Sequence, residues 1–262
     1  MIRRVAVVVG TLVLLAVACG GEDISGGSGS TTATASLDGE IIVSAASSLT
    51  EAFEALAIEF EAEHPGTSIT FNFGSSSSLS EQILEGAPAD VFASADGSNM
   101  AKLVDADVVS GAPVVFLTNE LAIVVKPGNP EGVEALADLA SLDVVALCGE
   151  RVPCGRFAAE ALSRAQVSLA ADDVTRGQDA KATVSAVADG DADAGIVYVT
   201  DVAAAGDAVE GITIPVELNV IANYPMAVLA ESRNAELAAA FVQFVAGRRG
   251  SVVFAAFGFG AP

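Results

Sequence analysis

The chain has 262 residues, of which 52% are hydrophobic, and it carries 12 lysines and arginines against 34 aspartates and glutamates. This length and apolar content suffice for a large core in one long or two small α/β domains. The net charge of -22 argues against nucleic acid and anionic lipid head groups as partners, because both attract basic surfaces. An anionic ligand would have to be held by local neutral donors, since the overall field opposes it.

The N-terminus has the pattern of a targeting segment. Arg3 and Arg4 form a basic start, and residues 5–18 form an apolar run too short to span a bilayer. The run ends in LAVACG, which resembles a bacterial lipobox, so we expect residues 1–18 to be a signal peptide and Cys19 to be lipid-modified. The alternative is an ordinary secretory signal with an incidental cysteine.

Residues 19–37 are rich in glycine, serine and threonine and show no apolar period. This composition is typical of a flexible tether. With a lipid on Cys19, the protein would be exported and anchored to the outer face of the cell membrane, with that lipid as its only membrane contact.

The first part of the folded region alternates strand and helix patterns. We expect strands at residues 40–43, 69–73 and 90–94, and helices at residues 49–63, 79–85 and 98–104. This order is typical of a doubly wound parallel sheet.

The second part continues the alternation. We expect strands at residues 114–117, 121–125, 144–147, 195–199, 213–216 and 224–229, and helices at residues 133–139, 156–163, 180–188, 201–205 and 234–246. Pro215 predicts that its strand lies at a sheet edge. The pattern indicates two α/β units, with seams near residues 118 and 222.

Two of the strand-to-helix turns carry small hydroxyl residues. The capping-box spacing of serine and glutamate appears in both, as Ser48 with Glu51 and as Ser78 with Glu81. Such turns present backbone N–H groups and hydroxyls that suit an anion. Because βα turns of a parallel sheet collect at one edge, the pair predicts a shared anion site. The alternative is that these serines only cap helices.

The cysteines are few. If Cys19 carries lipid, Cys148 and Cys154 remain as a pair in an oxidising setting, and a disulfide between them would close a tight loop. Two free buried thiols are the alternative. Zinc is disfavoured, because two cysteines and the distant His64 do not supply four ligands.

Five segments together resemble the extracytoplasmic molybdate-binding proteins of ABC transporters, and they occur in that family's order. They are Ser44–Thr50, Phe73–Leu79, Gly86–Asp96, Val152–Gly155 and Gly195–Tyr198. The resemblance covers the chain from about residue 40 to its end. It implies an α/β, two-lobed type II periplasmic-binding-protein fold, each lobe a mostly parallel sheet flanked by helices, with hinge crossovers. Residues 38–118 plus 223–262 would form lobe I, and residues 119–222 lobe II.

The resemblance also implies a ligand set. Ser48 and Ser76 would donate hydroxyl and backbone N–H bonds, Cys154 and Ala180 backbone N–H bonds, and Tyr198 its phenolic O–H. A register slip of one would bring in Ser47, Ser75 or Ser77 instead. Ser48, Ser76 and Tyr198 would bind the oxygens of molybdate, without coordinating the metal directly. Molybdate carries no proton near neutral pH, so donors suffice and no cation is required.

The implied function is a solute-binding lipoprotein, not an enzyme, that captures molybdate and tungstate and delivers them to an ABC permease. We expect a monomer without a cofactor. The alternative is a binder of another tetrahedral oxyanion such as sulfate. A metal-dependent hydrolase built on Asp90 and Asp96 is disfavoured, because these residues are expected at a turn and a helix cap. Lys181 and Arg151 are expected to be solvated; the alternative is that one of them offsets charge at the mouth of the site.

Overall fold

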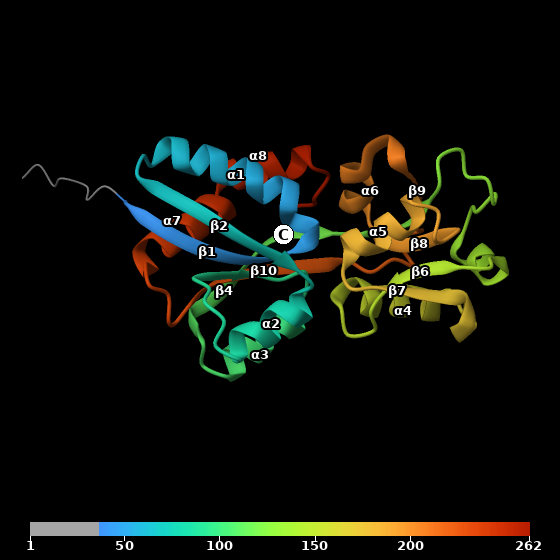
Figure 1. Ribbon diagram of the computed structural model, residues 1–262, viewed down its shortest axis with the longest axis horizontal. Coiled ribbons are helices and arrows are strands. Elements are labelled where there is room, and N and C mark those ends of the chain that lie inside the picture. Colours follow the sequence, from blue (N-terminus) through green and yellow to red (C-terminus); the bar gives the residue numbers. More distant parts are fainter. Residues whose placement is uncertain (1–36) are drawn as a thin grey trace, which may run out of the picture. The chain divides into compact units, whose positions relative to one another are not determined.

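The computed structural model describes residues 37–262, and these residues contain two five-stranded sheets with helices on both faces (Figure 1). The predicted signal peptide, the predicted lipidation site at Cys19 and nearly all of the predicted tether lie outside the described residues. Within residues 37–262, no single helix is long and apolar enough to cross a membrane; a bent pair, Ala235–Ala246 and Arg248–Ala256, meets that length and composition only jointly.

The first sheet has the strand order β2-β1-β3-β10-β4. Its strands are β1 (Gly39–Ala46), β2 (Thr67–Gly74), β3 (Val91–Ala93), β4 (Val109–Asn119) and β10 (Ala222–Leu229). Strands β1, β2 and β3 are parallel, whereas β10 runs antiparallel to both β3 and β4. Pro225 lies inside β10, where the register with β4 shifts, which accommodates a residue that has no N–H to donate.

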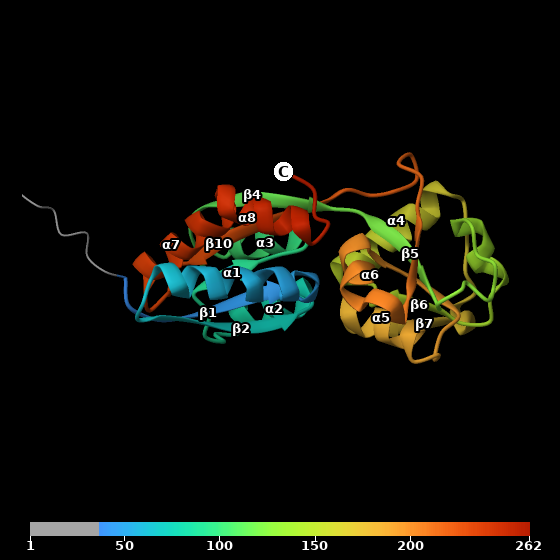
Figure 2. The same cartoon turned by 90° about the horizontal axis from the view of Figure 1, so that it is seen from above.

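Helices cover both faces of this sheet. They are α1 (Thr50–Glu63), α2 (Ser76–Leu84), α3 (Gly97–Asp105), α7 (Ala235–Ala246) and α8 (Arg248–Ala256). Figure 2 shows α1, α7 and α8 together. Phe53 of α1 and Phe241 of α7 pack edge to face between them, with ring centroids 6.3 Å apart. On the other face, Leu79 of α2 and Leu103 of α3 are buried against Phe92 of β3.

The second sheet has the order β7-β6-β8-β5-β9. Its strands are β5 (Leu121–Val125), β6 (Val145–Cys148), β7 (Val174–Gly177), β8 (Ala194–Tyr198) and β9 (Glu210–Thr213). Strand β6 is parallel to β7 and β8, and β5 is antiparallel to β8 and β9. The flanking helices are α4 (Pro153–Arg164), α5 (Ala180–Ala188) and α6 (Val199–Ala205). The short 3-10 helices are η1 (Ser47–Leu49), η2 (Leu136–Ser141), η3 (Ala171–Asp173) and η4 (Gly206–Ala208).

The chain passes from the first sheet to the second between β4 and β5, and returns between β9 and β10. The last strand and the last two helices therefore join the first sheet. We call the first sheet with its helices the first lobe, and the second sheet with its helices the second lobe.

Several local predictions are wrong. Neither predicted capping box forms: α1 has no side-chain cap, and α2 is capped by Ser75, whose Oγ accepts from the Ser78 N–H at 3.3 Å. Helix α4 begins at Pro153 instead of residue 156, because proline suits the first helical position. The edge strand lies at Glu210–Thr213, before Pro215, and residues 136–141 form a 3-10 helix. Strand β7 and helix α8 were not predicted.

Candidate functional site

One small pocket lies between the two lobes, and it collects all five residues of the predicted ligand set. It is lined by Ala46, Ser47, Ser48, Gly74, Ser75, Ser76, Ala95, Val152, Pro153, Cys154, Asp179, Ala180 and Tyr198. It contains about 200 Å³ free of protein atoms, part of it open to solvent. Pockets for drug-sized ligands measure roughly 300–1,000 Å³, so this one suits a smaller ligand such as an inorganic ion.

The lining residues share one structural feature, because they lie where helices begin. The helical segments η1, α2, α4, α5 and α6 all start at this pocket, two from the first lobe and three from the second. The first N–H groups of a helix have no partner within it, and the helix dipole makes this end positive. No lysine or arginine lines the pocket, and Asp179 is its only charged lining residue. Apart from the Asp179 carboxylate, which accepts from the Ala182 N–H at 2.9 Å, the lining is therefore neutral.

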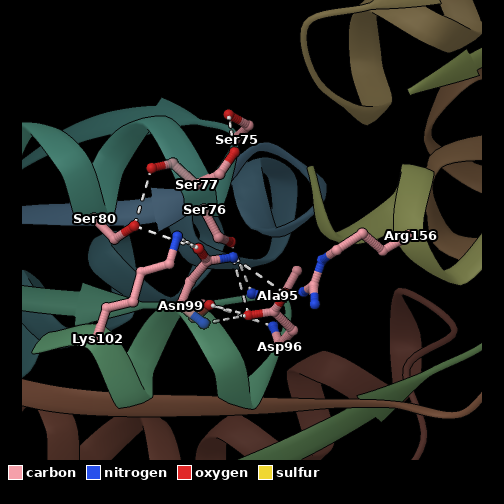
Figure 3. Close-up of polar contacts among 10 residues, drawn as sticks. Ser75, Ser76, Ser77, Ser80, Ala95, Asp96, Asn99, Lys102 and Arg156 are labelled. Atoms are coloured by element: carbon pink, nitrogen blue, oxygen red, sulfur yellow. Dashed lines mark hydrogen bonds and ion pairs between the residues drawn. The ribbon is translucent and has the colours of Figure 1, made fainter. Parts of the chain in front are cut away.

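Ser76 is the first residue of α2 and is 1% exposed. Its Oγ accepts a hydrogen bond from the Ala95 backbone N–H at 2.9 Å, as Figure 3 shows. The hydroxyl proton of Ser76 therefore remains available for a ligand. Ser77, which one register slip would select, does not line the pocket.

Ser48 does not cap a helix. It lies in η1, is 6% exposed, and its Oγ is 2.9 Å from the hydroxyl of Tyr224 in β10. Ser48 lines the pocket, and the serine pattern did not predict its contact with Tyr224.

Cys154 and Ala180 lie in the first turns of α4 and α5. Cys154 is bonded to Cys148, which confirms the predicted disulfide. A Cβ atom on Gly155 would lie 2.2 Å from the Gly149 carbonyl oxygen, so only glycine lets the cysteine loop fold back on the start of α4. The loop, the disulfide and this glycine together position the Cys154 N–H.

Tyr198 ends β8 and is 1% exposed, yet within the described chain its Oη has no hydrogen-bond partner. Burial raises the pKa of Tyr198 well above its ordinary value, Tyr224 and Asp201 raise this pKa further, and Arg156 acts in the opposite direction. The phenol therefore stays protonated and remains a donor. A buried hydroxyl that lacks an acceptor is the feature expected of a site awaiting an anion.

Asp201 lies in the first turn of α6, and its Oδ2 accepts from the Tyr198 N–H at 3.1 Å. Burial raises the pKa of Asp201 to about 7. The Tyr198 N–H and Lys181 act in the opposite direction, while Glu51 and Asp179 raise this pKa further. A titrating carboxyl thus lies beside the pocket.

Two ion pairs join the lobes on either side of the pocket. Lys181 of α5 pairs with Glu51 of α1, and Arg156 of α4 pairs with Asp96 at the start of α3 (Figure 3). Asp96 caps α3 as predicted, since its Oδ1 accepts from the Asn99 N–H at 2.8 Å. The side chain of Lys181 is partly exposed to solvent, as predicted, and its charge also has a partner on the other lobe.

Asp90 does not form a catalytic pair with Asp96. It is 6% exposed, and its carboxylate accepts from the Ile42 N–H at 2.7 Å and from Ser232 Oγ at 2.6 Å. These bonds tie β1 to the chain after β10. Among residues 37–262, no group of three or more histidine, cysteine, aspartate or glutamate side chains could hold a metal ion.

Comparisons with known proteins agree with this geometry. Residues 41–260 match the model of the bacterial extracellular solute-binding protein family. The molybdate-binding protein ModA of Mycobacterium tuberculosis is 35% identical over 224 residues, covering 85% of each chain. A putative ABC transporter substrate-binding lipoprotein of Bacillus subtilis is 30% identical over 226 residues, covering 84% of this chain and 86% of the relative.

Among solved structures, the sulfate-binding protein SubI of Mycobacterium tuberculosis superposes with a TM-score of 0.77 at 21% identity, covering 84% of this chain and 86% of the other. At this identity the likeness shows the fold alone. The two sheets and their crossovers are thus those of a periplasmic binding protein, as predicted, and the choice of ligand has to be argued from the pocket.

Proposed function

Because the chain belongs to the bacterial extracellular solute-binding protein family, we propose that it binds molybdate between its two lobes and delivers it to an ABC permease. The observation that carries this proposal is the buried hydroxyl of Tyr198, which has no hydrogen-bond partner within the described chain. It lies in a pocket that no lysine or arginine lines and where five helical segments begin. The name and 35% identity of the mycobacterial relative support molybdate as the ligand.

The proposed ligands are Ser48, Ser76, Cys154, Ala180 and Tyr198, acting through hydroxyl and backbone N–H groups. Donors alone satisfy a dianion that carries no proton, whereas hydrogen phosphate also needs an acceptor for its own proton. Asp179 is the one carboxylate in the lining, and its Oδ1 already accepts from the Ala182 N–H at 2.9 Å. Tungstate presents the same four acceptor oxygens, so it is a second ligand of this site. No cofactor is needed for binding.

The proposed moving bodies are residues 38–118 plus 223–262 and residues 119–222, which would close on the ligand about the two crossovers. We further propose that the protein is exported and held on the outer face of the cell membrane by a lipid on Cys19. The Bacillus relative that is named a lipoprotein supports this anchoring.

The test is a thermal-shift titration of the full chain with molybdate, tungstate, sulfate and hydrogen phosphate. A ligand at a thousandfold excess over its dissociation constant should stabilise the protein by roughly 4 kcal/mol, a shift on the order of 10 °C. A shift with molybdate and tungstate only is expected. A shift with sulfate alone would identify sulfate as the ligand instead of molybdate. No shift with any of the four anions would refute oxyanion binding.

Serine variants locate the site in the same assay. Ser48→Ala and Ser76→Ala should reduce the molybdate shift, because each removes a proposed donor. The matched control is Ser78→Ala, since Ser78 is exposed and lies outside the pocket.

A further inference from the structure

A chain of buried hydrogen bonds runs behind the pocket and ends on Ser48. Tyr224 is fully buried, and its Oη lies 2.9 Å from Ser48 Oγ and 3.3 Å from Asn119 Nδ2. The same Asn119 nitrogen donates to Thr200 Oγ1 at 2.8 Å. Tyr224 does not line the pocket.

The orientation of the Asn119 amide is fixed by its neighbours. The Glu120 N–H donates to Asn119 Oδ1 at 2.9 Å, so the amide oxygen faces Glu120 and the NH₂ group faces Thr200 and Tyr224. The Tyr224 oxygen accepts from Asn119 and has one proton of its own to give. Its other hydrogen-bonded neighbour is Ser48 Oγ at 2.9 Å, and either hydroxyl could donate in that pair. If Tyr224 donates to Ser48, the Ser48 proton is left to point into the pocket.

We infer that Tyr224 is a positioning residue of the anion site, which holds the Ser48 hydroxyl as a donor toward the ligand, with Asn119 setting the direction of the bonds. This inference rests on the proposed function. The ring of Tyr224 also packs edge to face on the ring of Tyr198, with centroids 5.9 Å apart. One residue of the first lobe thus contacts a proposed ligand-binding residue of each lobe.

The arrangement favours ligands that carry no proton. A serine hydroxyl that is free to rotate can donate or accept, whereas one that already accepts from Tyr224 presents a donor to its ligand. Asn119 is the last residue of β4, where the chain leaves the first lobe, and Thr200 belongs to α6 of the second lobe. The hydrogen bond between Asn119 and Thr200 therefore links the crossover to Ser48 through Tyr224.

A double-mutant cycle tests the inference by calorimetric titration with molybdate. Tyr224→Phe keeps the ring and removes the hydroxyl, and it should weaken binding about 3- to 10-fold in the unsubstituted chain. In the Ser48→Ala background the same change should alter the dissociation constant by less than about 2-fold, because its effect passes through Ser48. Equal factors in the two backgrounds would overturn the inference.

A selectivity ratio provides a second reading if Ser48→Ala binds too weakly to measure. Tyr224→Phe frees Ser48 to accept a proton, so the ratio of the hydrogen phosphate to the molybdate dissociation constant should fall by about 3-fold or more. Phe259→Leu is the packing control, since that ring lies edge to face 6.1 Å from Tyr224 and makes no polar contact with Ser48. An unchanged ratio in Tyr224→Phe would overturn the inference. If the unsubstituted chain bound none of the oxyanions, the proposed function would fail first and the inference with it.

Discussion

The hydroxyl of Tyr198 is buried, and no other group of the described chain forms a hydrogen bond with it. An unsatisfied buried polar group costs about 1–3 kcal/mol, so the free protein is less stable than its apolar packing would allow. A ligand that accepts this hydrogen bond recovers the loss. This loss of stability is confined to the pocket, and a bound ligand that accepts the hydrogen bond removes it.

The first prediction concerns this hydroxyl. Tyr198→Phe should leave the melting temperature of the ligand-free protein unchanged or raise it, because it removes a buried donor without a partner. The same change should weaken molybdate binding about 10-fold or more, since hydrogen bonds to charged groups contribute about 1.5–3 kcal/mol. Melting curves with and without molybdate measure both effects. A variant that is destabilised without ligand would show that Oη has a structural partner.

The second prediction concerns Asp201, whose pKa is about 7 in the folded protein and 3.8 in the unfolded chain. Between these pH values the folded state holds one more proton than the unfolded state, so the free energy of unfolding falls as pH rises. The contribution of Asp201 to stability should be complete below about pH 4 and lost above about pH 7.

Asp201→Asn isolates this effect, because the amide oxygen still accepts from the Tyr198 N–H. The unsubstituted chain should lose stability relative to Asp201→Asn as the pH is raised from 5 to 8, measured by denaturant unfolding. Lys181, Glu51 and Asp179 face the same carboxyl and are common to both proteins. Parallel stability curves would show that Asp201 does not titrate in this range.

At the scale of elements, the lobes are joined beside the pocket by two ion pairs of different burial. The side chains of Lys181 and Glu51 are 41% and 36% exposed, so water screens their attraction. Arg156 is 38% exposed, but its partner Asp96 is only 3% exposed. Removing a cation from a buried carboxylate costs more than separating two charges in water.

The third prediction follows from this difference. Arg156→Met should weaken molybdate binding by about 10-fold or more, and Lys181→Met by less than about 5-fold, because both pairs join the two lobes beside the pocket. Titration calorimetry measures each. The control is Arg249→Met, whose pairs with Glu59 and Glu63 lie within the first lobe. Equal losses in all three variants would indicate a general effect of charge.

At the scale of the whole molecule, a net charge of -22 repels an incoming dianion until it reaches the helix N-termini. The field acts over about 10 Å at 0.1 M ionic strength, whereas the donors of the pocket act only on contact. Affinity and association rate therefore depend on different parts of the protein.

The fourth prediction is that the association rate for molybdate rises with ionic strength, by about 2- to 10-fold between 0.01 and 0.15 M. The chain has no tryptophan and two tyrosines, Tyr198 and Tyr224, both at the site, so tyrosine fluorescence in a stopped-flow instrument reports binding there. Sucrose at matched viscosity is the control. A rate that falls with added salt would show that the mouth is locally positive.

The sequence by itself determined the alternation of strands and helices, the two serine turns and the cysteine pair, whereas the five residues that meet in the pocket came from the resemblance to a known family. These features are local, because hydrophobic period, turn residues and short spacings act within about ten residues. Even so, the serine spacing predicted the wrong helix caps. Ser48 and Ser78 each fit the capping pattern, but in the folded protein neither of them caps its helix.

Only the tertiary structure decided which residues form hydrogen bonds and ion pairs around the pocket. Ser48 meets Tyr224 across 176 residues of sequence, and Asn119 meets Tyr224 across 105 and Thr200 across 81. The ion pairs between lobes join elements of two different sheets. No periodicity or motif encodes such pairs. The contacts of Tyr224 with Ser48 and Asn119 depend on the strand order within the first sheet, and the contacts between lobes depend on how the two sheets come together.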